Sequence, residues 1–96
     1  MAERVILEWQ WDDGNIAYLG RRGLSRKLVR QVALGAPRLR RNLKGRAATH
    51  LMIGRDDGGQ IWTICIVEVT NSPGVWRAFN GWPSDDEEKA WYNRYK

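Results

Sequence analysis

The stretch RLRRNLKGRAATHLMIGR, residues 38–55, decides how the rest of the chain is arranged. Residues 38–41 alternate weakly between basic and apolar side chains, as a short edge strand does. Lys44-Gly45 predicts a turn, and the apolar run over residues 47–54 predicts a second strand. The stretch therefore predicts two strands around a turn, with positive charge gathered along one edge of a sheet.

The charges of the chain are divided unevenly along its length. No Asp or Glu occurs from Gly14 through Arg55, although this segment holds eleven of the sixteen Lys and Arg residues. The remainder carries five basic and eleven acidic residues, so the net charge of +5 divides into +11 and −6. Because each Lys or Arg that meets a phosphate releases condensed counterions, the segment predicts a polyanionic partner.

The composition is that of one small globular domain, residues 1–96. Cys65 is the only cysteine, which excludes an intrachain disulfide and favours a small buried thiol in a reducing cytoplasm. No signal peptide is evident, and the longest apolar run, residues 61–67, is far shorter than the roughly 20 residues of a spanning helix. We therefore expect a cytoplasmic protein without a membrane partner.

A strand and two helices are predicted in the first half of the chain. Residues 5–11 carry aromatics at alternate positions, as a strand does, and residues 12–15 (DDGN) carry helix-start signals. This helix should end by residues 20–23, where two glycines occur. Ser25 is a suitable N-cap for the second helix, and Gly35 suits the left-handed position that ends it.

The second half of the chain predicts a run of strands followed by one helix. Residues 57–59 (DGG) form a hairpin turn, and the apolar run over residues 60–70 predicts a central strand covered on both faces. Residues 75–82 form its partner, and residues 84–87 (SDDE) read as a capping box. The order β-α-α-β-β-β-β-α indicates an α+β fold, a small antiparallel sheet with two N-terminal helices and a C-terminal helix on one side.

Basic side chains that bracket the predicted turn form a candidate phosphate-binding arm: Arg38, Arg40, Arg41, Lys44 and Arg46. A solvated charged face is the alternative interpretation of such a run. The absence of acids over the whole segment favours binding of a polyanion.

His50 is the only histidine and lies in the apolar strand next to this arm. Cleavage of RNA needs a group that activates the 2′-hydroxyl, a group that protonates the leaving 5′-oxygen, and a cation for the charged transition state. His50 could perform one proton transfer, because its unperturbed pKa lies near working pH. Arg46, Arg55 or Arg77 could supply the cation, and a purely structural histidine is the alternative.

Other polar and aromatic residues leave open alternatives. Glu68 interrupts the most apolar strand, so it needs a partner, and both a salt bridge to Arg77 and a role as a base are open. Trp76 and Trp82 could stack on bases, although core packing is favoured for each. One His and one Cys without a carboxylate cluster predict no metal site, and no cofactor is expected.

Several short motifs carry a resemblance through their order and spacing: Trp-Asp near the start, Asn15-Ile16-Ala17, Arg22-Gly23-Leu24, Pro37, the arm RRNLKGRAATHLMIGR, Gly59-Gln60-Ile61, and Trp82 before an acid-led helix. Over nearly its whole length the chain resembles BrnT-type toxins of the wider RelE/ParE-like group. The resemblance implies a compact α+β toxin, a ribonuclease that blocks translation and is held inactive by an antitoxin.

Carried over by position, the resemblance adds Arg22 and Glu87 to the candidate residues and again selects Arg46 and Arg55. The family usually has Lys/Arg-His-Gly where this chain has Arg21-Arg22-Gly23, and Ser-Ala-Arg where this chain has residues 80–82, Asn-Gly-Trp.

Three functions are compatible with these features. The leading hypothesis is the toxin of a bacterial type II toxin–antitoxin system, a metal-independent endoribonuclease that acts on RNA, free or on the ribosome, and binds a cognate antitoxin. The second is a non-catalytic nucleic-acid-binding module on the same fold. In the third, the basic face is a protein interface for an acidic antitoxin or for a second copy of the chain in a homodimer.

Overall fold

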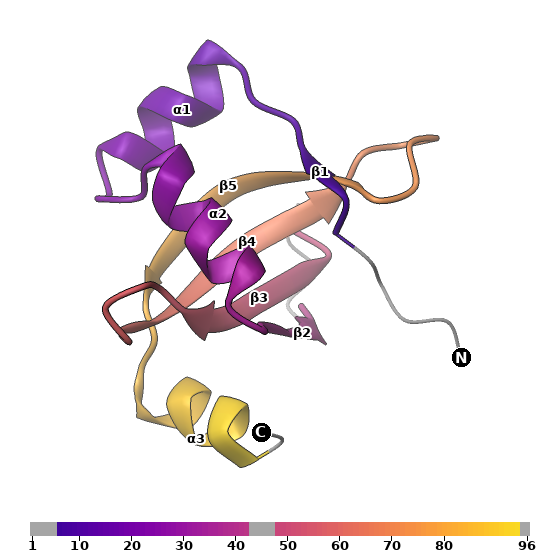
Figure 1. The fold of residues 1–96 in the computed structure, drawn as a ribbon. Coiled ribbons are helices and arrows are strands. Elements are labelled where there is room, and N and C mark those ends of the chain that lie inside the picture. Colours follow the sequence, from indigo (N-terminus) through magenta and orange to yellow (C-terminus); the bar gives the residue numbers. More distant parts are fainter. Residues whose placement is uncertain (1–5, 43–47, 95–96) are drawn as a thin grey trace.

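A computed structural model describes residues 6–42 and 48–94 and contains three helices and one five-stranded sheet (Figure 1). The elements are β1 (Glu8–Trp9), α1 (Asp13–Gly20), α2 (Arg26–Leu34), β2 (Arg38–Arg41), β3 (His50–Arg55), β4 (Ile61–Glu68), β5 (Val75–Pro83) and α3 (Asp86–Arg94). This order, β-α-α-β-β-β-β-α, is the order that the sequence predicts. No helix in the described ranges is long and apolar enough to cross a membrane.

The sheet is mixed, which corrects the prediction of a purely antiparallel sheet. Its strand order is β1-β5-β4-β3-β2, and β2 to β5 pair antiparallel along consecutive connections. β1 instead pairs parallel with β5, with Trp9 opposite Trp76. The chain leaves β1 through two helices, so no hairpin imposes an antiparallel direction on it.

The prediction that β4 is the central strand is confirmed, since β4 is third among the five strands. Ile64 and Ile66 point to one face of the sheet and are fully buried. Thr63 and Cys65 alternate with them, point to the other face and are buried too. Burial on both faces explains why this strand is apolar almost without interruption.

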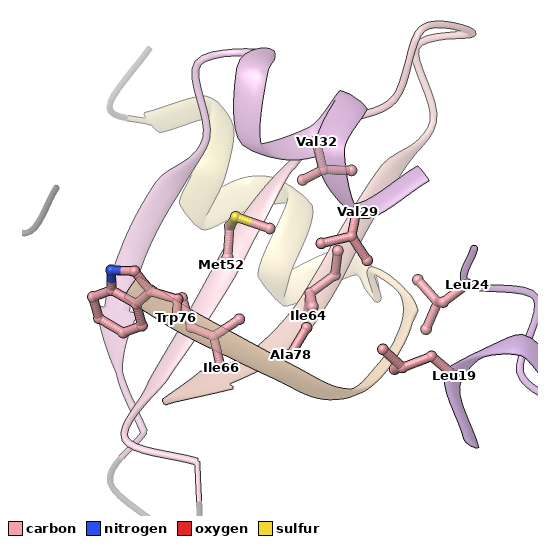
Figure 2. Packing of buried hydrophobic residues seen from close by; sticks show 9 residues of the cluster. All are labelled: Leu19, Leu24, Val29, Val32, Met52, Ile64, Ile66, Trp76 and Ala78. Atoms are coloured by element: carbon pink, nitrogen blue, oxygen red, sulfur yellow. The ribbon is translucent and has the colours of Figure 1, made fainter. Parts of the chain in front are cut away.

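The main core lies between α1, α2 and one face of the sheet, which we call the α2 face. Val29 and Val32 of α2 pack there with Met52 and Ile64, and Figure 2 shows these side chains pointing toward one another. Trp76 is completely buried in the same cluster. Such burial stabilises the fold by roughly 1.5–3 kcal/mol for each large apolar side chain.

α3 lies on the opposite face, which we call the α3 face, so the prediction that all helices share one side is wrong. A Cβ on Gly81 would lie 2.8 Å from Leu24, which places Gly81 on the α2 face and its neighbour Trp82 on the other. Glu88 of α3 accepts a hydrogen bond from Trp82 Nε1 at 3.1 Å. Figure 1 shows α3 well separated from α1 and α2.

The caps of α1 and α2 form as predicted, and the cap of α3 is shifted by one residue. Asp12 Oδ1 accepts from Asn15 N at 2.9 Å, and Ser25 Oγ accepts from Leu28 N at 3.1 Å. For α3 the reciprocal cap joins Asp85 to Glu88, rather than beginning at Ser84. The Ser84 hydroxyl is buried against that of Thr63 at 2.7 Å, so it does not cap the helix.

Close backbone packing, rather than a left-handed conformation, explains Gly35. Ala36 has the positive φ of 55°, whereas Gly35 is the C-cap of α2 with φ −93°, so the predicted assignment is wrong by one residue. A Cβ on Gly35 would lie 2.8 Å from the carbonyl oxygen of Arg55, which leaves no room for a side chain. The glycine therefore lets the end of α2 approach the end of β3.

Candidate nucleic-acid interface

Five exposed basic residues lie where α1 ends and α2 begins. We call this group the basic corner, and it consists of Arg21, Arg22, Arg26, Lys27 and Arg30. On α2, three of them lie within one helical turn and are exposed, whereas Val29 and Val32 of the same helix are buried. The amphipathic pattern of this helix therefore fixes the core side and leaves the charged side in solvent.

The residues of the basic corner form no ion pair within the described part of the chain, although Asp56 and Asp57 line the same shallow pocket as Lys27 and Arg30. None of its five residues forms an ion pair with a carboxylate of residues 6–42 or 48–94. Arg22 donates to the Tyr18 hydroxyl at 2.9 Å, and its guanidinium lies 4.9 Å from the centre of that ring. These contacts hold the Arg22 side chain against Tyr18 of α1.

The arginines of β2 lie elsewhere, against α3. Arg40 makes a bidentate contact with Glu87, with both N–O distances 3.0 Å. The guanidiniums of Arg38 and Arg40 lie 5.9 and 5.1 Å from the centre of the Trp91 ring. The hydrogen bond and charge of Arg40 lower the pKa of Glu87, so the carboxylate stays ionised at neutral pH.

Other predicted basic contacts are dispersed. Arg41 is exposed at the end of β2, on the α2 face next to His50. Arg55 is half-buried, its guanidinium lies 5.9 Å from the Tyr92 ring centre, and its Nε is buried without a hydrogen-bond partner. Lys44 and Arg46 lie outside the described residues. The acid-free segment is thus spread over both faces of the sheet.

Among the predicted catalytic residues that the structure describes, His50 and Arg77 lie on different faces of the sheet. His50 is half-buried on the α2 face, where its ring meets Trp76 edge-on at 5.4 Å and its Nδ1 lies 2.9 Å from the Thr49 hydroxyl. Arg77 is on the α3 face, where it pairs with Asp12 at 2.7 Å. The sheet separates the two side chains, so they cannot act on one phosphate.

Glu68 and Arg77 do not form a salt bridge, which was one of the two alternatives for Glu68. Arg77 is directly opposite Val67, so Glu68 points to the other face of the sheet. Glu68 accepts a hydrogen bond from Gly74 N at 2.8 Å, in the turn before β5. Asp12 is the actual partner of Arg77, whose hydrogen bond lowers the pKa of that carboxyl.

A groove of about 900 Å³ lies on the α3 face, and sequence reasoning missed it. Its apolar lining includes Leu51, Cys65 and Phe79. Polar residues also line it: Tyr18, Arg40, Asn42, Arg77, Asn80, Asp85, Glu87 and Glu88. These residues come from segments far apart in the sequence, so no local motif could have indicated the groove.

Cys65 and Trp82 line the groove and differ in how far they are buried. Burial raises the pKa of the Cys65 thiol to about 11, so it stays protonated and is a poor nucleophile at neutral pH. Trp82 is 36% exposed and donates its ring N–H to Glu88, whereas Trp76 is fully buried. The preferred core interpretation is therefore confirmed for Trp76, while Trp82 has an exposed surface.

Comparison with known proteins does not identify a function for this surface. No protein-family model, curated protein or solved structure matches the chain. Within the described ranges, no group of three His, Cys, Asp or Glu side chains could hold a metal ion. The charge and contacts of the basic corner are therefore the evidence on which a function can rest.

Proposed function

We propose that the protein is a nucleic-acid-binding module that contacts the phosphate backbone through its basic corner. The observation that supports this is the group of five exposed cations without an ion pair to a described carboxylate. The second predicted function, binding without catalysis, fits this geometry best, since His50 and Arg77 lie on opposite faces.

The spacing of the charges suits an extended polyanion. Arg26 and Arg30 are one helical turn apart, so their Cα atoms are about 6 Å apart along the axis. Arg22 extends the positive surface along α1 to Tyr18, which also lines the groove. A strand that follows the basic corner would therefore reach the rim of the groove at Tyr18.

Counterion release sets the size of the expected effect. For single strands, the slope of log K against log salt concentration is about −0.7 per neutralised phosphate. Five contacts would give a slope of about −3.5, which is a loss of roughly 100-fold in affinity between 50 and 200 mM salt.

The test is fluorescence anisotropy of a labelled 20-nucleotide single-stranded RNA over this salt range. We expect saturable binding with a slope of about −3.5, and a DNA of the same sequence should give a similar slope, since phosphates make the contacts. A slope near zero, or no binding at 50 mM salt, would rule out the proposed function.

A toxin-like endoribonuclease is the second candidate, and the groove favours it. Its volume of about 900 Å³ is within the range of small-ligand sites. Tyr18 connects the groove with the basic corner, so bound RNA would have a concave surface beside it.

This candidate predicts growth arrest and RNA decay when the protein is induced in bacteria. Because Arg77 lines the groove and His50 does not, Arg77→Ala should abolish the arrest and His50→Ala should retain it. Arrest that needs His50 but not Arg77 would place any chemistry on the α2 face. Normal growth of induced cells that accumulate folded protein would eliminate the toxin function.

A further inference from the structure

The carboxylate of Glu87 contacts the guanidinium group of Arg40 on β2, a group that can also bind a phosphate. Both oxygens of its carboxylate contact Arg40, each at 3.0 Å, in the fork geometry that arginine also uses for phosphate. The pair joins residues 47 positions apart, so it forms only when α3 docks on the sheet. The first turn of α3 thus presents an anion to β2 from within the chain.

Several contacts hold the two sides of this pair in place. Asp85 and Glu88 cap the N-terminus of α3 reciprocally, with distances of 2.8 and 2.9 Å.

Trp91, one turn after Glu87, lies beneath the guanidiniums of Arg38 and Arg40. The Tyr92 hydroxyl donates to the Ala36 carbonyl at 3.2 Å, next to the start of β2. Glu87 is therefore presented to Arg40 by an ordered helix.

The pair is accessible to a competing anion. The side chain of Glu87 is 66% exposed and that of Arg40 is 25% exposed. Ion pairs with this much solvent contact are weak, because water and salt screen them. A phosphate brought close by other contacts would compete with Glu87 for Arg40 without unfolding α3.

We infer that Arg40 is a phosphate-binding residue that Glu87 occupies in the unbound protein, so that α3 restrains nucleic-acid binding at β2. The inference rests on the proposed function, because the basic corner supplies most of the attraction for the strand. Glu87 acts as an internal substitute for phosphate. Its release adds one contact beside Arg38, whose guanidinium shares the Trp91 ring.

The test compares Glu87→Gln with Asp86→Asn, using the labelled single-stranded RNA as the probe. Both substitutions remove one negative charge from the first turn of α3, but the side chain of Asp86 has no hydrogen bond or ion pair to a described residue. We expect Glu87→Gln to tighten binding about 5-fold at 50 mM salt, because it frees one cation for a phosphate. Asp86→Asn should change affinity less than twofold. Equal effects of the two variants would show only a general charge effect and would overturn the inference.

A double variant shows whether the gain passes through Arg40. Arg40→Gln combined with Glu87→Gln should return affinity to the wild-type level, whereas a double variant that binds as tightly as Glu87→Gln would contradict the inference. Glu87→Asp keeps the charge but shortens the side chain, so it should tighten binding without a change in net charge. This second variant remains informative if Glu87→Gln does not fold.

The two proposals fail in different ways. Loss of the cations of the basic corner without any effect on binding would refute the proposed function, while the comparison of Glu87→Gln with Asp86→Asn would still report on β2. A different result would refute only the restraint by α3. In that case binding is lost when the cations of the basic corner are removed, but Glu87→Gln and Asp86→Asn have the same RNA affinity.

Discussion

Replacement of three basic residues on α2 by glutamine should weaken binding of single-stranded RNA on the order of 100-fold at 50 mM salt. The variant is Arg26→Gln/Lys27→Gln/Arg30→Gln, and its effect follows from the loss of three phosphate contacts. All three side chains are exposed, and none pairs with a described carboxylate, so the fold should not depend on them. Anisotropy titrations give the affinity, and circular dichroism should give an unchanged spectrum and melting temperature.

A matched control separates charge from side-chain shape. Arg26→Lys/Arg30→Lys keeps both positive charges and should retain affinity to within about threefold, because phosphate contacts of this kind depend mainly on charge. If the lysine variant binds as weakly as the glutamine variant, the arginines act through specific geometry rather than through counterion release. If the glutamine variant binds like the wild type, the basic corner is not the binding surface.

Trp76→Ala should destabilise the protein by about 3–5 kcal/mol, the usual loss for a large buried side chain replaced by alanine. Trp76 has no exposed surface, belongs to the main core cluster, and meets the His50 ring at 5.4 Å. Since a domain of this size is stable by roughly 5–15 kcal/mol, much of the native population should be lost on warming. Urea denaturation followed by circular dichroism measures the change.

Trp82→Ala is the control for this prediction, because Trp82 lies on the same strand but is 36% exposed. Its loss removes less apolar contact together with one hydrogen bond to Glu88, so we expect about 1–2 kcal/mol. Equal destabilisation by the two variants would mean that the core between α2 and the sheet is not the main source of stability.

Local signals predicted much of the fold, because they act within a few residues. The helix start at Asp12 and the N-cap at Ser25 depend on side chains that bond to the nearby backbone. The DGG turn before β4 is fixed in the same way, since Asp56 Oδ1 accepts from the N–H groups of Gly58 and Gln60. Continuous apolarity likewise identified β4 as the strand buried on both faces.

Features that depend on distant partners could not be predicted from the sequence. The capping residue of α3 is Asp85 rather than Ser84, because Thr63, which lies on another strand, takes the Ser84 hydroxyl. The side of the sheet that α3 covers depends on Arg40, which is 47 positions from Glu87 and contacts it only in the folded chain.

The same limit explains the revision of the candidate site. The absence of acids between residues 14 and 55 was visible in the sequence, and the basic corner comes from that segment. The sequence could not show that Arg40 meets Glu87, a carboxylate from outside the segment, or that Arg55 stacks on Tyr92. The sequence also could not show that Glu68 and Arg77 point to opposite faces of the sheet, because this depends on the pairing register of β4 with β5.

The most direct test of phosphate binding by the basic corner compares the wild type with the triple glutamine variant. The quantity measured is the slope of log affinity for RNA against log salt concentration. If phosphates contact the basic corner, removal of three cations should reduce the size of the slope by about 2, with both proteins equally folded. Equal slopes for the two proteins would show that nucleic acid does not bind through Arg26, Lys27 and Arg30.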